Sequence, residues 1–254
     1  MKILFVADVF GKPGREAVEE RLAGLKDELG AAFCIVNAEN VADGAGATPR
    51  LADRLLAAGA DVITLGNHAW RRREIGPYLE SSERVIRPAN FASGAPGRGL
   101  AVVDGVAVVN LQGSLFMATP VSPFEVLDAL VDEARAQAHV VVVDFHAEAT
   151  SEKVAVARVL DGRVTAVIGT HTHVQTNDAR VQPGGTAAIT DAGMTGPHDS
   201  VIGVKADLAI ARMRTGMPVR FEPASGGVRI EGVVVECNAD GRALSCEPLR
   251  VPVS

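Results

Sequence analysis

The chain has 254 residues and a net charge of −6, with 47% hydrophobic and 22% charged residues. This balance is typical of a globular protein and excludes a disordered chain, which needs low hydrophobicity and a high net charge. The acidic excess argues against a protein that grips long nucleic acids through a general basic surface.

The N-terminal segment reads MKILFVADVF, and Asp8 interrupts its apolar run before a signal peptide could be completed. No apolar run approaches the roughly 18 residues that a membrane span needs. We therefore expect a cytoplasmic protein without membrane contact.

Short apolar runs alternate with amphipathic segments over the first two thirds of the chain, which predicts an α/β core. The predicted elements, in chain order, are strand Lys2–Ala7, helix Pro13–Leu29, strand Phe33–Asn37, helix Pro49–Ala58, strand Asp61–Leu65, strand Val106–Leu111, helix Pro123–Ala138, strand His139–Phe145, a helix after Thr150 and strand Thr165–Gly169. The strands are apolar throughout, as expected of strands covered on both faces.

The last part of the chain has strand-like segments and no helix between them. Pro218–Phe221, Val228–Cys237 and Ala243–Val251 are joined by Gly-rich turns, so we expect antiparallel strands that complete a second sheet. Without a linker or an internal repeat, residues 1–254 are predicted to form a single domain. Cys237 and Cys246 flank a turn and could face each other, but reduced thiols are favoured in a cytosolic chain.

Polar side chains follow five of the apolar runs at the point where each run ends. They are Asp8, Glu39 with Asn40, Asn67 with His68, His146 with Glu148, and His171 with His173. Ligands of α/β proteins gather outside the carboxyl ends of the strands, so these five ends can converge on one pocket.

Seven of these residues form a set of nitrogen and oxygen ligands without sulfur. They comprise three imidazoles, two carboxylates and two amide oxygens, from His146, His171, His173, Asp8, Glu39, Asn40 and Asn67. Seven donors exceed the three protein ligands that a single catalytic zinc ion uses, but they suffice for two metals sharing a bridging carboxylate. Two metal ions roughly 3.5–4 Å apart can stabilise both the attacking and the leaving oxygen in a phosphoryl displacement.

Each motif is weaker alone than in combination. The segment GTHTH, residues 169–173, favours a metal site because alternating histidines after a strand point the same way. Asp8 alone could cap a helix, and Glu39 and Asn40 could be ordinary polar loop residues. His146 alone is more often a satisfied buried histidine. Their joint occurrence indicates a dinuclear site.

The order of these motifs resembles that of the calcineurin-like metallophosphoesterases. The stretches NAEN, LGNHAW, DFHAEATSEK, GTHTHVQT and DAGMTGP are most similar to the bacterial branch of 2′,3′-cyclic-nucleotide phosphodiesterases, and the resemblance spans nearly the whole chain. Two positions depart from the wider superfamily pattern. Phe10 stands where a histidine is usual, and Glu39 replaces the usual bridging Asp.

The resemblance implies an α/β/β/α sandwich, in which two packed mixed sheets are flanked by helices. It also implies two metal ions, with iron favoured and manganese or zinc as alternatives. The first metal is expected on Asp8, Glu39, Asn40 and His173, and the second on Glu39, Asn67, His146 and His171. A metal-bridging hydroxide is the expected nucleophile, and His68 is the expected general acid.

The expected partner is a small nucleotide or another phosphodiester, and the resemblance allows a homo-oligomer. Trp70 and the segments Arg87–Phe91 and Ala192–His198 are candidate nucleoside contacts, while Arg71–Arg73 fits a solvated surface. Glu148 and Thr150 are candidates for orienting His146 or a metal-bound water, and Asp144 is another candidate for orienting His146. Two alternatives stay open at this stage, a phosphomonoesterase with the same site and a regulatory protein that binds a nucleotide without turnover.

Overall fold

A computed structural model describes residues 1–253, and Ser254 lies outside the described residues. The helices are α1 (Gly11–Leu29), α2 (Pro49–Ala57), the 3-10 turn η1 (Ala69–Arg71), α3 (Ile75–Ser81), α4 (Pro123–Gln137), α5 (Thr150–Val159) and α6 (Ala206–Thr215). The strands are β1 (Lys2–Val6), β2 (Phe33–Asn37), β3 (Val62–Thr64), β4 (Val85–Ile86), β5 (Leu100–Val103), β6 (Val106–Gln112), β7 (Val140–His146), β8 (Ala166–Thr170), β9 (Arg180–Val181), β10 (Ala187–Ile189), β11 (Gly196–Pro197), β12 (Val228–Cys237) and β13 (Ala243–Pro252).

The described strands form two mixed sheets. In the first sheet, β1 to β4 are parallel, and the antiparallel strand β12 joins β1 to β13 and β11. In the second sheet, β6, β7, β8 and β10 are parallel, and β5 and β9 add antiparallel edges. The parallel strands of each sheet therefore end on one edge, where ligand sites of α/β proteins form.

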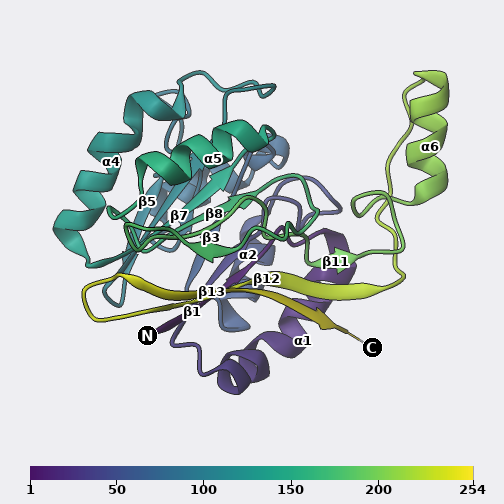
Figure 1. The fold of residues 1–254 in the computed structure, drawn as a ribbon. Helices are drawn as coiled ribbons and strands as arrows, with labels where there is room; N and C mark the ends of the chain where they lie inside the picture. Colours follow the sequence, from purple (N-terminus) through teal and green to yellow (C-terminus); the bar gives the residue numbers. More distant parts are fainter. Residues whose placement is uncertain (254) are drawn as a thin grey trace.

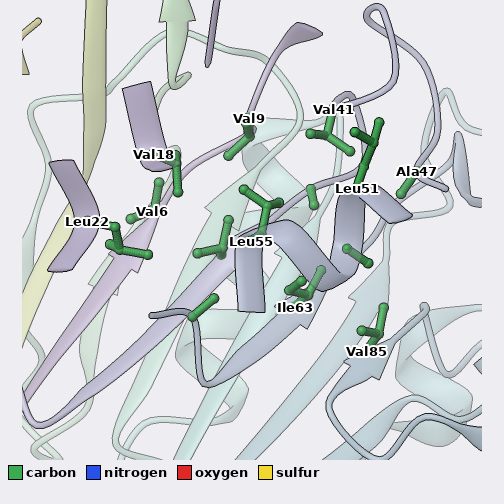
Figure 2. Close-up of a cluster of buried hydrophobic side chains, with 14 of the residues drawn as sticks. Val6, Val9, Val18, Leu22, Val41, Ala47, Leu51, Leu55, Ile63 and Val85 are labelled. Carbon is green, nitrogen blue, oxygen red and sulfur yellow. The ribbon is translucent and has the colours of Figure 1, made fainter. Parts of the chain in front are cut away.

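The two sheets pack face to face between layers of helices (Figure 1). Phe5 and Ile35 of the first sheet share one core cluster with Val108 and Ile168 of the second. The outer face of the first sheet packs against α1, α2 and α3. Figure 2 shows Leu22 of α1 and Leu55 of α2 beside Ile63 of the sheet. The outer face of the second sheet packs against α4 and α5. The predicted α/β/β/α sandwich is confirmed, whereas the single domain over residues 1–254 stays a prediction.

Most predicted elements occur within two residues of their expected bounds. The apolar runs are strands that are covered on both faces of their sheet, as their composition predicts. Helix α1 begins at Gly11 instead of Pro13, and its first residue adopts a φ of 61°, which suits glycine. Helix α2 has Pro49 in its first turn and Thr48 as its N-cap, whose hydroxyl accepts from the Leu51 N–H.

Two expectations about the C-terminal part are wrong. Pro218–Phe221 is not a strand, because Phe221 packs beneath the Arg212 guanidinium on the return segment from α6. β12 and β13 complete the first sheet instead of the second, since β12 pairs with the open edge of β1 over Lys2–Val6. Helix α6 was not predicted, and it stands apart from both sheets (Figure 1).

The three cysteines are free, and Cys246 pairs in register with Val235 instead of facing Cys237. Burial raises the pKa of the Cys34 and Cys237 thiols, which keeps them protonated and unreactive. Within residues 1–253, every helix is too short or too polar to cross a membrane.

The layer between α2 and the first sheet gives a direct test of the packing. Leu55 is completely buried there, whereas Leu244 on β13 is 61% exposed. Leu55→Ala should lower the free energy of unfolding by about 2–5 kcal/mol, because it removes apolar contacts and leaves a cavity. Leu244→Ala should change it by less than about 0.5 kcal/mol. Denaturant titration measures both, and equal losses would contradict this arrangement of the core.

Candidate active site

All five predicted strand ends converge on one region of the molecule. Asp8 follows β1, Glu39 and Asn40 follow β2, and Asn67 and His68 follow β3 of the first sheet. His146 is the last residue of β7, and His171 and His173 follow β8 of the second sheet. The region therefore draws its side chains from the carboxyl ends of both sheets.

Two groups of side chains within this region have geometry suited to a metal ion. One ligand atom each of Asp8, Glu39 and His173 lies within 4.8 Å of the others, and the same holds for Glu39, His146 and His171. Both groups contain Glu39. The sequence-based division of ligands between two metals has the same pattern.

An unpaired buried oxygen indicates that the first group fits a cation. Asp8 Oδ1 is buried and accepts no hydrogen bond from the described residues, while Asp8 Oδ2 accepts from the His171 N–H at 2.9 Å. A buried carboxylate oxygen without a partner is costly, so a cation at this position would compensate it.

The amide groups of Asn40 and Asn67 complete the two groups. Asn67 Oδ1 lies 3.0 Å from His146 Nε2, on the side of the second group. Asn40 Nδ2 lies 2.8 Å from Glu39 Oε1 and 3.0 Å from His173 Nε2. Amide oxygen and nitrogen have the same shape and are assigned from their hydrogen bonds, and a bound metal would favour the oxygen here.

Gly66 gives the second group its space. A Cβ atom at this position would lie 2.4 Å from both Glu39 Oε2 and the His146 ring. Only glycine therefore fits between β3 and these ligand atoms, which explains the glycine of the GNH motif in physical terms.

The two buried carboxylates have opposite pKa shifts. Burial, reinforced by the charge of Glu39, raises the pKa of Asp8 well above its usual range. Burial also raises the pKa of Glu39, but the charge and hydrogen bond of His146 outweigh it and leave that pKa well below its usual range. A metal ion would remove this conflict by stabilising both carboxylates in their charged form.

The histidines are also displaced from their ordinary pKa. Burial lowers the pKa of His146, but the charge and hydrogen bond of Glu39 outweigh it and bring it to about 9. Burial and the charge of His146 lower the pKa of His171 to about 3, so that ring is neutral and able to bind a metal. Burial lowers the pKa of His173 as well, against the Ile202 carbonyl bonded to its Nδ1–H.

The sequence predicts that the two histidines of GTHTH point the same way, as alternating residues after a strand do. The structure differs from this prediction. β8 ends at Thr170, and His171 and His173 both have positive φ, at 99° and 64°. Such conformations cost of order 1–3 kcal/mol and are characteristic of functional sites. The turn directs the two rings into different groups of ligands.

Asp191, which the sequence reasoning missed, holds this turn in place. Its Oδ2 accepts from the Thr172 N–H at 3.0 Å and from the Thr172 hydroxyl at 2.7 Å. The buried Lys153 ammonium donates to the same oxygen at 2.8 Å. Asp191 follows the short strand β10, and so it is another polar residue at the end of a strand. The apolar run of β10 is too short for the strand to be predicted from the sequence.

His68 sits at the rim of the region. Its Nδ1 lies 3.0 Å from Asn40 Oδ1 and 3.2 Å from Glu39 Oε1, and its side chain is 27% exposed. Because Nδ1 is engaged with these oxygens, the other ring nitrogen, Nε2, remains available to a bound molecule.

A cavity of about 600 Å³ opens above the two groups. Glu39, His68 and His171 line its floor, and Arg71, Arg212 and Phe221 belong to its walls. A volume of this size holds a nucleotide and not merely a phosphate ion. Arg71 lines the cavity and is at the same time solvent-exposed, as expected for this run.

The other expected nucleoside contacts lie elsewhere. Trp70 packs against Phe91 with 5.8 Å between ring centroids, and Arg87 donates to backbone carbonyls of residues 88–97. His198 donates through Nδ1 to the Gly196 carbonyl. Trp70, Arg87 and His198 are not among the described residues that line the cavity.

The chain matches the profile of YmdB-like proteins over residues 4–249. It is 46% identical over 240 residues to a 2′,3′-cyclic-nucleotide 2′-phosphodiesterase of Bacillus subtilis, covering 93% of this chain and 91% of that protein. The chain belongs to the YmdB-like family.

Solved structures agree with this membership. A structure described as a novel phosphatase from Mycoplasma pneumoniae is 35% identical, with a TM-score of 0.91, and the match covers 99% of this chain and 93% of that one. A 5′-nucleotidase precursor from Thermus thermophilus shares the fold, with a TM-score of 0.58 at 15% identity over 100% of this chain and 54% of that one. The resemblance of this YmdB-like protein to the bacterial 2′,3′-cyclic-nucleotide phosphodiesterases is confirmed.

A buried chain of hydrogen bonds orients His146. Thr170 Oγ1 donates to Asp144 Oδ1 at 2.7 Å, so it accepts from His146 Nδ1 at 2.9 Å and directs Nε2 toward the second group. Asp144 is thus linked to His146 as one of the candidates expected. The other two candidates differ, because Glu148 contacts His171 Nε2 at 3.1 Å and Thr150 is exposed.

Removing this hydroxyl should weaken metal binding without changing any group that could bind the metal. Thr170→Val should lower affinity roughly 10–100-fold, since His146 loses the partner that fixes its tautomer. Thr170→Ser keeps the hydroxyl and should retain most of the affinity. Competition with a chromophoric chelator measures both variants. Unchanged affinity in Thr170→Val would show that the hydroxyl does not orient His146.

Proposed function

We propose that this YmdB-like protein is a metal-dependent phosphodiesterase that hydrolyses small phosphodiesters, with 2′,3′-cyclic nucleotides as the preferred class. The observation that carries this proposal is the pair of ligand groups that share Glu39 at the floor of an open cavity. The Bacillus subtilis relative, named for hydrolysis of 2′,3′-cyclic nucleotides, supports the choice of substrate.

The proposed ligand sets follow the two groups. Asp8, Glu39, Asn40 and His173 would hold one metal ion, and Glu39, Asn67, His146 and His171 would hold the other. The donors are oxygen and imidazole nitrogen, which suit iron or manganese and also accept zinc, and we propose iron as the preferred metal. Bound metals of this kind acidify water into a nucleophile and neutralise phosphate charge.

The residues of this chain perform the remaining steps. His68 is the proposed general acid, because its Nδ1 lies 3.2 Å from Glu39 Oε1 while Nε2 can donate a proton to the departing ribose oxygen. The hydrogen bonds around His146 and the turn at Thr172 keep the ligand atoms in position.

One observation favours a second activity. The Arg71 guanidinium borders the cavity, and a cation there suits the dianionic end of a phosphomonoester. The Mycoplasma structure, described as a phosphatase, supports the same alternative. A protein that binds a nucleotide without turnover has no need of an acid at the position of His68, so we favour catalysis.

Reconstituted protein distinguishes these activities. Metal-stripped protein would receive iron, manganese, zinc or magnesium and then 2′,3′-cyclic AMP, 3′,5′-cyclic AMP, bis(p-nitrophenyl) phosphate or p-nitrophenyl phosphate. We expect the highest kcat/KM for the 2′,3′-cyclic substrate, with about two metal ions per chain. Dominant hydrolysis of the monoester would favour the phosphomonoesterase, and binding without any turnover would favour the regulatory protein.

The role of His68 depends on the leaving group. His68→Ala should lower kcat for 2′,3′-cyclic AMP by about 10²–10⁴-fold, because an alkoxide needs a proton to leave. The loss on bis(p-nitrophenyl) phosphate should be much smaller, since p-nitrophenolate leaves without one. His139→Ala, at the opposite end of β7 from His146, serves as the control. Equal losses on both substrates would contradict acid catalysis by His68.

A further inference from the structure

The cavity extends from the ligand groups to the root of α6. Ile202, Val204 and Pro223 form an apolar wall on that side, and Arg212 and Phe221 extend it along the α6 segment. The floor, in contrast, is polar and rich in ligands. One end of the cavity therefore suits a phosphate group, and the other suits an apolar or aromatic body.

A cation–π pair stands in this wall. The Arg212 guanidinium lies over the Phe221 ring at 5.1 Å from its centroid, and both side chains line the cavity. Phe221 is 41% exposed, so a flat ring can still reach it. Burial of an aromatic side chain is normally favourable, so an exposed ring is unusual. An exposed ring beside a charged cavity is consistent with a ligand that covers it.

The wall is held at a fixed position relative to the ligand groups. The Ile202 carbonyl, at the root of α6, accepts from His173 Nδ1 at 3.0 Å. Gly203 and Gly44 enclose the Phe10 ring so closely that a Cβ on either would lie 2.6–2.7 Å from it. Phe10 also contacts the His173 ring edge to face. Phe10, at the position of the usual histidine, thereby connects the α6 root to the floor.

From this geometry we infer that Arg212 and Phe221 form a stacking platform for the base of a nucleotide whose phosphate lies over the ligand groups. The inference rests on the proposed function and adds the element that would distinguish nucleotides from other diesters. Stacking accepts any base, because every base presents a π face, and Arg planes stack in the same way as aromatic rings.

A pair of substrates tests the platform. 2′,3′-Cyclic AMP and glycerol 1,2-cyclic phosphate share the five-membered cyclic diester, but only the first has a base. Phe221→Ala should raise KM for the nucleotide roughly tenfold, as expected for loss of one stacking contact, with a far smaller effect on kcat. The loss of kcat/KM on the nucleotide should be at least five times the loss on the base-free ester.

Matched variants separate stacking from damage to α6. Phe221→Trp should restore the nucleotide KM, and Arg212→Ala should raise it. Met213→Ala, at a 75% exposed position on the same helix that is outside the cavity lining, should behave as the parent protein. Equal losses on both substrates in Phe221→Ala, or equal kcat/KM of the parent for both substrates, would overturn the platform while leaving a cyclic phosphodiesterase intact.

A binding measurement keeps the inference testable without turnover. The indole of Phe221→Trp, in a Trp70→Phe background, should be quenched by adenosine 3′-monophosphate and not by inorganic phosphate. Quenching in a protein that hydrolyses none of the esters would support the platform and overturn the proposed function. Turnover of 2′,3′-cyclic AMP without quenching would overturn the platform alone.

Discussion

Asp8 and Glu39 are two carboxylates buried side by side at the ends of neighbouring parallel strands, and their charge requires compensation. Two charges less than 5 Å apart repel by about 3 kcal/mol at the effective dielectric of a protein interior. His146 lies against Glu39 at 3.2 Å and offsets part of this cost. Asp8 Oδ1 still accepts no hydrogen bond from the described residues and has only His146 Nδ1 at 3.9 Å, so the balance is incomplete for protein atoms alone.

The two-sheet sandwich explains why these groups meet. A single parallel sheet would bring together the ends of β1, β2 and β3, with their carboxylates and amides. The second sheet adds the ends of β7 and β8, with histidines whose ring nitrogens lie within 4.8 Å of a carboxylate oxygen of Asp8 or Glu39. The proposed acidic ligands therefore come from one sheet and the proposed imidazole ligands from the other. Any change in how the sheets pack would alter the distance between the two kinds of ligand.

Long apolar runs and the polar residues after them are strong local signals, and they were sufficient to predict an α/β core and the residues that converge. The two-sheet sandwich was implied by the family resemblance. It failed where local pattern and tertiary position disagree. The turn that separates His171 from His173 depends on hydrogen bonds to Asp191, twenty residues after His171. No periodicity in the sequence predicts these hydrogen bonds. Thr170 resembles any polar residue of a turn until its bonds to Asp144 and His146 are known.

The α6 segment shows the same limit from another direction. Phe221 fits a strand by composition, but its place beneath Arg212 depends on the way the chain returns from α6. Arg71, likewise, belongs to a basic run that suits solvent, and only the position of η1 beside the cavity shows its relation to the site. The positions of Phe221 and Arg71 depend on contacts between distant segments, and the local pattern of a single sequence does not reveal such contacts.

The central claim is that Glu39 is shared by two metal ions at the meeting point of the sheets. Crystals of the iron-loaded protein, measured on both sides of the iron absorption edge, test it most directly. We predict two anomalous peaks roughly 3.5–4 Å apart, one beside Asp8 and His173 and the other beside His146 and His171, with Glu39 between them. A single peak, or peaks away from Glu39, would contradict the account.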